Sequence, residues 1–88
     1  MIKYFPAPDI EQHAREIAEH AGIKRDFSRV HFMRSRGSSS RRTLARCHAM
    51  PQVLQAALAT KAHYVVEVIS ENFDKMAEKE KTKTIIHE

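Results

Sequence analysis

Apolar residues recur at helical spacing near the start of the chain. Pro6 and Pro8 predict extended backbone, and Asp9 with Gln12 three residues later is typical of a helix capping box. Gly22 fits the left-handed position that ends many helices. Between these ends, the apolar face consists of Ile10, Ala14, Ile17 and Ala21. We therefore expect a helix between Asp9 and Gly22.

Alternating apolar positions predict three strands. In residues 27–35, Val30 and Phe32 share one face. Residues 36–41 are rich in Gly and Ser and predict a turn, so residues 42–49 would return as the second strand of a β-hairpin. The third strand, residues 63–69, is apolar on both faces, which is typical of a strand that is central or covered on both sides.

Helical patterns fill the rest of the chain. Residues 52–60 are rich in Leu and Ala and predict a short helix or a loop, and residues 73–76 predict a helical turn. Residues 78–88 predict a helix with Ile85 and Ile86 turned inward. The expected fold is α+β: an N-terminal helix, a three-stranded antiparallel sheet and a C-terminal helix, in a single domain spanning residues 1–88.

Length and composition indicate a small folded domain. Apolar residues make up 42% of the 88 residues and charged residues 30%, which are ordinary values for a soluble protein. The sequence contains neither an apolar run long enough to span a membrane nor a signal-peptide pattern. Cys47 is the single cysteine and cannot form an internal disulfide, which fits a reducing compartment. A cytoplasmic location is therefore expected.

Positive charge is concentrated in residues 24–46, which contain eight basic residues and one acidic residue. Arginine binds phosphate groups well, so this segment could contact the backbone of a nucleic acid. The candidate contacts are Arg34, Arg36, Arg41, Arg42 and Arg46. No aromatic residue is interleaved with them, so stacking on bases is not indicated. The alternative is a solvated, charged hairpin edge that discourages pairing with other strands.

The C-terminal segment Ile85-Ile86-His87-Glu88 follows the strongest strand and resembles the approach to an H-E-x-x-H zinc motif. Residues 34–38 (Arg-Ser-Arg-Gly-Ser), 45–51 (Ala-Arg-Cys-His-Ala-Met-Pro) and 63–71 (His-Tyr-Val-Val-Glu-Val-Ile-Ser-Glu) extend the likeness along essentially the whole chain. Together they resemble the N-terminal part of a small archaeal and phage family of metallopeptidases, which is similar to the SprT-like proteases. This resemblance implies part of a minimal zincin scaffold, zinc as cofactor and a protein substrate.

Within the resemblance, His87 matches the first zinc ligand and Glu88 the general base. The family also implies a Ser or Thr cap where this chain has Ala77. Catalytic zinc needs about three protein ligands, and the remaining ligands would lie beyond Glu88. We therefore expect a C-terminally truncated fragment that binds no zinc tightly and is inactive as the 88-residue chain. Uncovered apolar surface around Ile85 and Ile86 would then favour self-association.

Other histidines and the cysteine are weaker candidates. Cys47 and His48 are adjacent and should point to opposite faces of a strand, with Cys47 more consistent with a small buried residue. His31, His48 and His63 lie on neighbouring predicted strands and could converge, although structural roles are the more common explanation.

Overall fold

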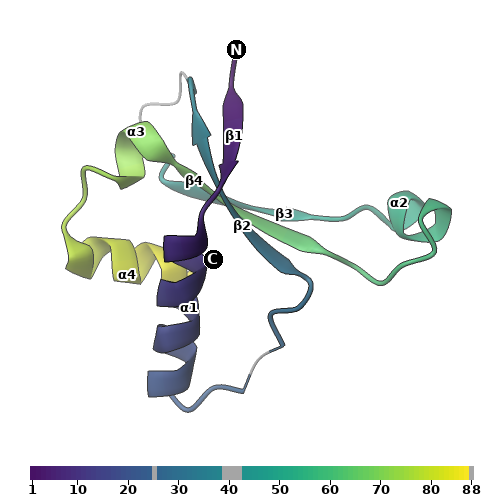
Figure 1. Cartoon of the computed structure of the whole chain (residues 1–88), viewed down its shortest axis with the longest axis horizontal. Helices are drawn as coiled ribbons and strands as arrows, with labels where there is room; N and C mark the ends of the chain where they lie inside the picture. Colours follow the sequence, from purple (N-terminus) through teal and green to yellow (C-terminus); the bar gives the residue numbers. More distant parts are fainter. Residues whose placement is uncertain (25, 39–42, 88) are drawn as a thin grey trace.

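Figure 1 shows the computed structural model, which describes residues 1–24, 26–38 and 43–87. Residue 87 is described by its backbone alone. The described strands are β1 (Lys3–Pro6), β2 (Val30–Arg36), β3 (Ala45–Ala49) and β4 (Tyr64–Ile69). The described helices are α1 (Pro8–His20), α2 (Gln52–Ala57), α3 (Ser70–Phe73) and α4 (Glu78–His87). The α+β class expected from the sequence is confirmed.

The sheet differs from the predicted one in strand number and strand direction. The described residues form four strands in the order β1-β2-β4-β3, and β2 runs parallel to β4. The predicted hairpin between β2 and β3 is wrong because β4 lies between them, with Cys47 of β3 opposite Val66 of β4. The prediction that β4 is central is confirmed. A strand that is apolar on both faces buries most surface when neighbours flank it on each side.

Strand β1, which was not predicted from the sequence, lies at the sheet edge and pairs antiparallel with β2. The prolines near the N-terminus predicted extended backbone without indicating a pairing partner. Pro6 lacks a backbone N–H, so an edge position is where a strand tolerates it. Ala7 then donates its N–H to the Phe32 carbonyl at 2.9 Å and leads directly into α1.

Helix α1 begins two residues earlier than predicted, because its N-cap is Ala7 and not Asp9. Ala7 is its N-cap and Pro8 occupies the first turn, where a missing N–H costs nothing. Asp9 therefore lies inside the first turn and does not cap the helix, and Gln12 donates to Glu16 and takes no part in a capping box.

The same C-terminal motif ends α1 and α2. In α1, Gly22 has φ of 71° and donates to the Glu19 carbonyl, and Ile23 donates to the Ala18 carbonyl. Both bonds are those of a Schellman motif, which confirms the predicted role of Gly22. In α2, Ala59 has φ of 52° and donates to Ala56, and the next residue, Thr60, donates to Gln55. The left-handed position is therefore glycine in one helix and alanine in the other.

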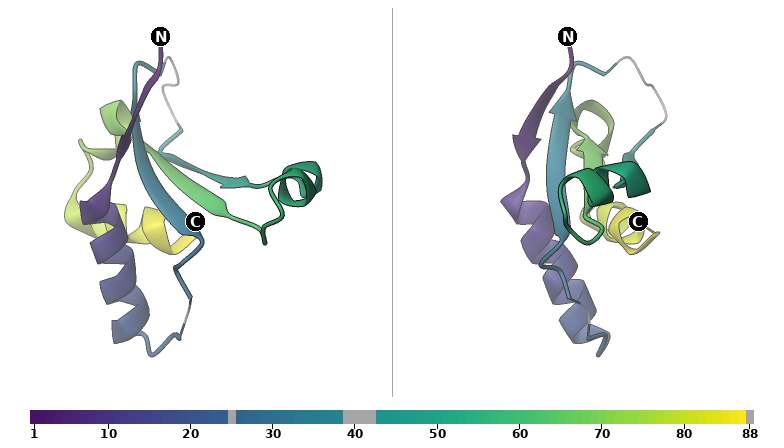
Figure 2. Two further views of the ribbon diagram at one scale, coloured as in Figure 1. Left: turned by 45° about the vertical axis from the view of Figure 1, so that its right-hand side comes forward. Right: turned by 90° about the vertical axis from the view of Figure 1, so that its right-hand side faces the viewer.

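The core lies between the sheet and the helices on one of its faces. Its buried members are Ala7, Ile10, Ala14, Phe32, Val66, Val68 and Phe73, with Ile85 of α4 packed against them. Helix α1 contacts both β2 and α4 (Figure 2). We call this side of the sheet the helix face. The opposite face carries a shallow open pocket that is lined by strand residues, including Met33, Val65 and Glu67.

Residues 47–64 form an arm that extends away from the two long helices. The arm consists of most of β3, helix α2 and the start of β4, and α2 lies at its tip in Figures 1 and 2. No residue of α2 is buried. None of the helices that the structure describes combines the length and apolar character needed to cross a membrane.

Candidate functional site

Helix α4 carries the candidate metal ligand at its end. His87 is the last residue of the helix, whereas its side chain and the whole of Glu88 lie outside the described residues. Polar contacts hold the middle of the helix in place: the Thr82 hydroxyl lies 2.9 Å from Nε2 of His13 on α1, and the Lys81 ammonium lies 5.7 Å from the centre of the Phe73 ring. The position of α4 is therefore fixed by α1 and by the turn that follows β4.

The last turn of α4 borders an apolar concavity, which we call the wedge. Its lining includes Ala14 and Ile17 of α1, Phe32 and Val66 of the sheet, and Ile85 and Ile86 of α4. The wedge has a volume of about 200 Å³ and is partly open to solvent. Ile86 is 59% exposed, so the predicted inward orientation holds for Ile85 and is wrong for Ile86.

The described part of the chain brings no three His, Cys, Asp or Glu side chains together as a metal site. Of the three histidines that could have converged, the structure brings two together. His31 Nε2 lies 2.9 Å from His63 Nδ1, and the ring centres are 5.2 Å apart with nearly parallel planes. That centroid separation is the 2.9 Å gap plus the two ring radii, so the two nitrogens face each other along one line. This geometry describes an N–H···N hydrogen bond in which one imidazole donates and the other accepts.

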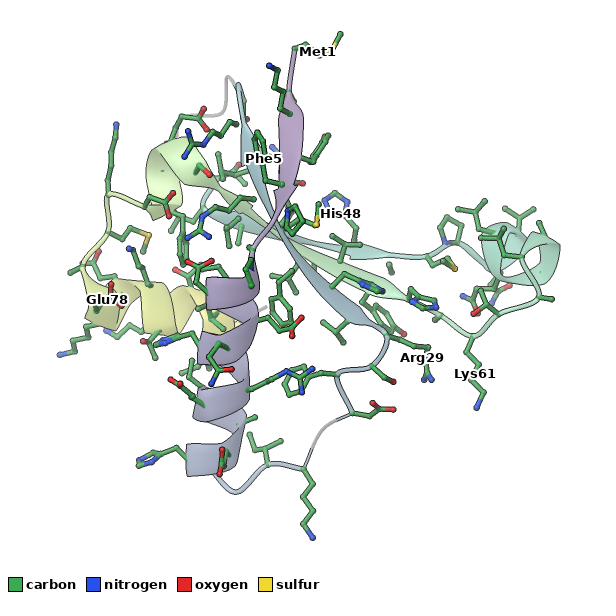
Figure 3. All side chains as sticks on the ribbon, viewed as in Figure 1. Met1, Phe5, Arg29, His48, Lys61 and Glu78 are labelled. Carbon is green, nitrogen blue, oxygen red and sulfur yellow. The ribbon has the colours of Figure 1, made fainter. Side chains whose placement is uncertain are left out.

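His48 makes a different contact. The Nε2 atom of His48, which is labelled in Figure 3, lies 2.7 Å from Oε1 of Glu67. The side chain of Glu67 is only 5% exposed. Burial alone would raise the pKa of Glu67, but the polar partners Ser35 and His48, together with the charges of His48 and Arg46, hold it below its ordinary value. Glu67 is therefore a buried, ionised carboxylate on the face of the sheet opposite α1.

The pairing of Glu67 with His48 was missed in the sequence. Glu67 is the single acid within an otherwise apolar strand, a pattern that signals a specific partner because a buried charge is costly alone. The partner could not be identified without the antiparallel register between β3 and β4. Cys47 and His48 do point to opposite faces, as predicted, but Cys47 is exposed, so its predicted burial is wrong.

The candidate arginines do not form one cluster in the described part of the chain. Arg34 binds Asp9 through two nitrogens and lies 3.2 Å from Asp74, which raises the pKa of its guanidinium through hydrogen bonds with both carboxylates. With its side chain only 20% exposed, Arg34 joins β2 to α1 and to the end of α3. Its positive charge is used within the fold.

Of the other arginines, Arg36 lies on the helix face of β2 and Arg46 on the opposite face of β3. Both are exposed, while Arg41 and Arg42 lie outside the described residues. The hairpin that was expected to gather these arginines does not form. Nucleic-acid binding therefore stays a prediction that depends on Arg36, Arg41, Arg42 and Arg46.

Comparison with known proteins identifies one similar group. A family model described as "Putative phage metallopeptidase" matches residues 2–88. Neither the curated proteins nor the solved structures include a match. The matched region contains the complete sheet and all four described helices.

Proposed function

Because the chain belongs to the phage metallopeptidase family, we propose that the natural polypeptide containing it hydrolyses peptide bonds with the help of zinc. His87 is the proposed zinc ligand and Glu88 the proposed general base. The observation that carries this proposal is the sequence pair His87-Glu88, whose first residue is the last of α4, in a chain that matches the family from residue 2 to residue 88. An imidazole that binds zinc, followed directly by a carboxylate that acts as general base, is the pair of groups that H-E-x-x-H sites use.

The imidazole of His87 is a suitable ligand for zinc, but one ligand is too few to hold the metal. A catalytic zinc takes about three protein ligands, and His87 supplies one. When bound, zinc polarises the substrate carbonyl and makes water a better nucleophile. The contribution that we assign to this chain is positional: α1 and the core hold α4, and Glu88 would accept a proton from water. On these grounds we propose that the 88-residue chain alone is inactive.

We also infer that the chain is similar to the SprT-like proteases and comes from an archaeal or phage setting, from the segments around Arg36, His48 and Glu67. A cytoplasmic location is supported by the single cysteine, which is exposed and free. The proposed substrate is protein, by family resemblance.

The test uses the natural polypeptide and two variants at the motif. His87→Ala should abolish stoichiometric zinc binding, measured by equilibrium dialysis. Glu88→Gln should keep zinc and lower the rate of cleavage of an unfolded protein about 100-fold or more, since it removes a general base. Zinc binding that is unchanged in His87→Ala would refute the assignment. For the isolated 88-residue chain, one firmly bound zinc together with chelator-sensitive cleavage would refute its proposed inactivity.

A further inference from the structure

The molecule exposes more surface than its size requires. Its accessible area is 6548 Å², whereas a compact monomer of this mass exposes roughly 5,300 Å². Its radius of gyration is 13.8 Å, compared with roughly 12 Å for a compact domain of this length. The surface excess, roughly 1,200 Å², is larger than the roughly 800 Å² that each partner buries in a standard protein interface. The chain thus has enough uncovered area for a stable dimer.

Much of the uncovered apolar surface lies on the arm. Val53, Leu54 and Leu58 on and beside α2 are 72%, 46% and 64% exposed. No acidic residue stands in the first turn of α2 and no basic residue in its last turn, and Lys61 is the one Lys, Arg, Asp or Glu in residues 47–64. An exposed helix normally carries charged residues on its solvent side, so α2 has the composition of a helix that packs against a partner.

The wedge is the matching concave surface on the same chain. Its lining is apolar, and Ile23 and Ile86 at its margin are 54% and 59% exposed. The arm cannot fill the wedge of its own chain, because α2 projects away from α1 and α4 (Figures 1 and 2). A second copy of the chain provides an arm without this restriction.

Strand register makes the arm and the wedge one continuous surface. On the helix face, Val66 in the wedge lies beside Cys47, and Tyr64 lies beside Ala49 farther along the arm. Tyr64, Cys47 and Ala49 are all exposed, with Tyr64 at 42%. A partner that approaches the wedge would therefore also cover this side of the arm.

We propose that two copies of this chain clasp each other, with the arm of each copy lying in the wedge of the other. The contact is isologous: the same arm and wedge are used twice around a two-fold axis, so the assembly closes as a dimer. The anchors on the arm are Val53, Leu54 and Leu58, and the receiving residues are Ile23, Ile85 and Ile86. Both surfaces lack formal charge at these positions, so association does not require burying an unpaired ion.

The first test measures mass by light scattering coupled to size-exclusion chromatography, from micromolar to millimolar concentration of the 88-residue chain. We expect the mass to rise to twice 10.1 kDa and to stop there. A monomer throughout the series would overturn the proposal. Growth beyond the dimer would overturn the closed two-fold arrangement.

The second test substitutes exposed residues, which should leave the fold intact. An arm variant, Val53→Glu with Leu58→Glu, and a wedge variant, Ile23→Glu with Ile86→Glu, should each raise the dimer dissociation constant at least about tenfold, because each buries a charge at an apolar contact. Ile2→Glu, at an exposed position outside both surfaces, is the matched control and should not change it. Circular dichroism checks that each variant is folded.

The third test mixes the two variants. A dimer of one arm variant and one wedge variant contains one intact contact, since the unaltered arm can enter the unaltered wedge. The mixture should therefore associate more strongly than either variant alone, as measured by energy transfer between differently labelled chains. Equal association in all three samples would overturn the pairing of arm with wedge, even if the unaltered chain is a dimer.

Discussion

Glu67 places a carboxylate in the middle of the central strand with its side chain almost fully buried. His48 is its hydrogen-bonding partner at 2.7 Å. The pKa of Glu67 is lowered below the usual 4.5, so the folded state favours the ionised form relative to the unfolded chain. This contribution is present above about pH 4.5 and is lost as the pH falls through the lower folded-state value.

Glu67→Gln should therefore change how stability depends on pH. The variant keeps the shape of the side chain but cannot ionise, so the unaltered protein should be the more stable of the two near neutral pH, and the difference should shrink as the pH falls below 4.5. Urea unfolding at a series of pH values measures it. Two curves that stay parallel through this range would show that Glu67 does not contribute through its charge. Glu16→Gln, at an exposed position on α1, is the control and should leave the curve nearly unchanged.

Single residues were predicted well where the local backbone decides their role. Gly22 has the left-handed conformation that its place directly after an amphipathic helix indicated. Arg34 was assigned to a nucleic-acid surface because it belongs to a basic segment and its acidic partners were not known. Asp9 and Asp74 are 25 and 40 residues away in the sequence, so nothing local to Arg34 could indicate the contact.

The C-terminal ends of α1 and α2 provide a matched pair at the scale of elements. Both end in the same hydrogen-bonded motif, with Gly22 in one and Ala59 in the other at the left-handed position. A Cβ atom in this conformation is strained by about 1 kcal/mol. At the same backbone geometry, the position in α1 therefore has a residue without a Cβ atom and the position in α2 has a residue with one.

Replacing glycine by alanine in α1 and alanine by glycine in α2 should change the free energy of unfolding in opposite directions. Gly22→Ala should lower the free energy of unfolding by about 1 kcal/mol, since no atom lies near the added Cβ and strain is the main cost. Ala59→Gly should raise it, by up to about 1 kcal/mol. Chemical denaturation of the two variants and the unaltered chain gives both values. The same sign for both substitutions would contradict the assignment of strain to the left-handed position.

Elements were predicted more successfully than their pairing. The alternation in residues 63–69 located β4 and indicated a central position. It could not show that β2 runs parallel to β4, because parallel and antiparallel neighbours present the same alternation along each strand. The predicted hairpin relied on the short distance in sequence between residues 36 and 42. In the structure, β4 pairs with β2 along one edge and with β3 along the other, and so takes the place that the hairpin partner would have had.

At the scale of the whole molecule, stability should be distributed unevenly. The backbone of β4 pairs on both sides and its residues from Val66 to Ile69 are buried, whereas no residue of α2 is buried. Local opening costs least where few buried contacts are lost. The body formed by α1, α4 and the part of the sheet outside residues 47–64 should therefore be more stable than the arm.

Hydrogen exchange measured at a concentration low enough to keep the chain monomeric tests this distribution. Amides of β4 from Val66 to Ile69 should be the slowest to exchange, and those of α2 should be among the fastest. Helix α1 is the internal comparison, because it has the same kind of hydrogen bonds but contributes Ile10 and Ala14 to the core. Protection of α2 equal to that of α1 would show that the arm is not a separate, weaker unit.

Strand order also sets the sequence of events as the polypeptide leaves the ribosome. β2 emerges early and finds β1 as a partner on one side, but its other side must wait for β4, which starts at Tyr64. β3 emerges in the interval and has no place beside β2, since its partner is also β4. A nascent chain that has not yet reached Ile69 therefore carries two strands with open hydrogen-bonding edges, a condition that favours pairing with other chains. Synthesis of β4 supplies the missing partner of both strands at once, which leaves β2 paired on both sides and β3 with only its outer edge open.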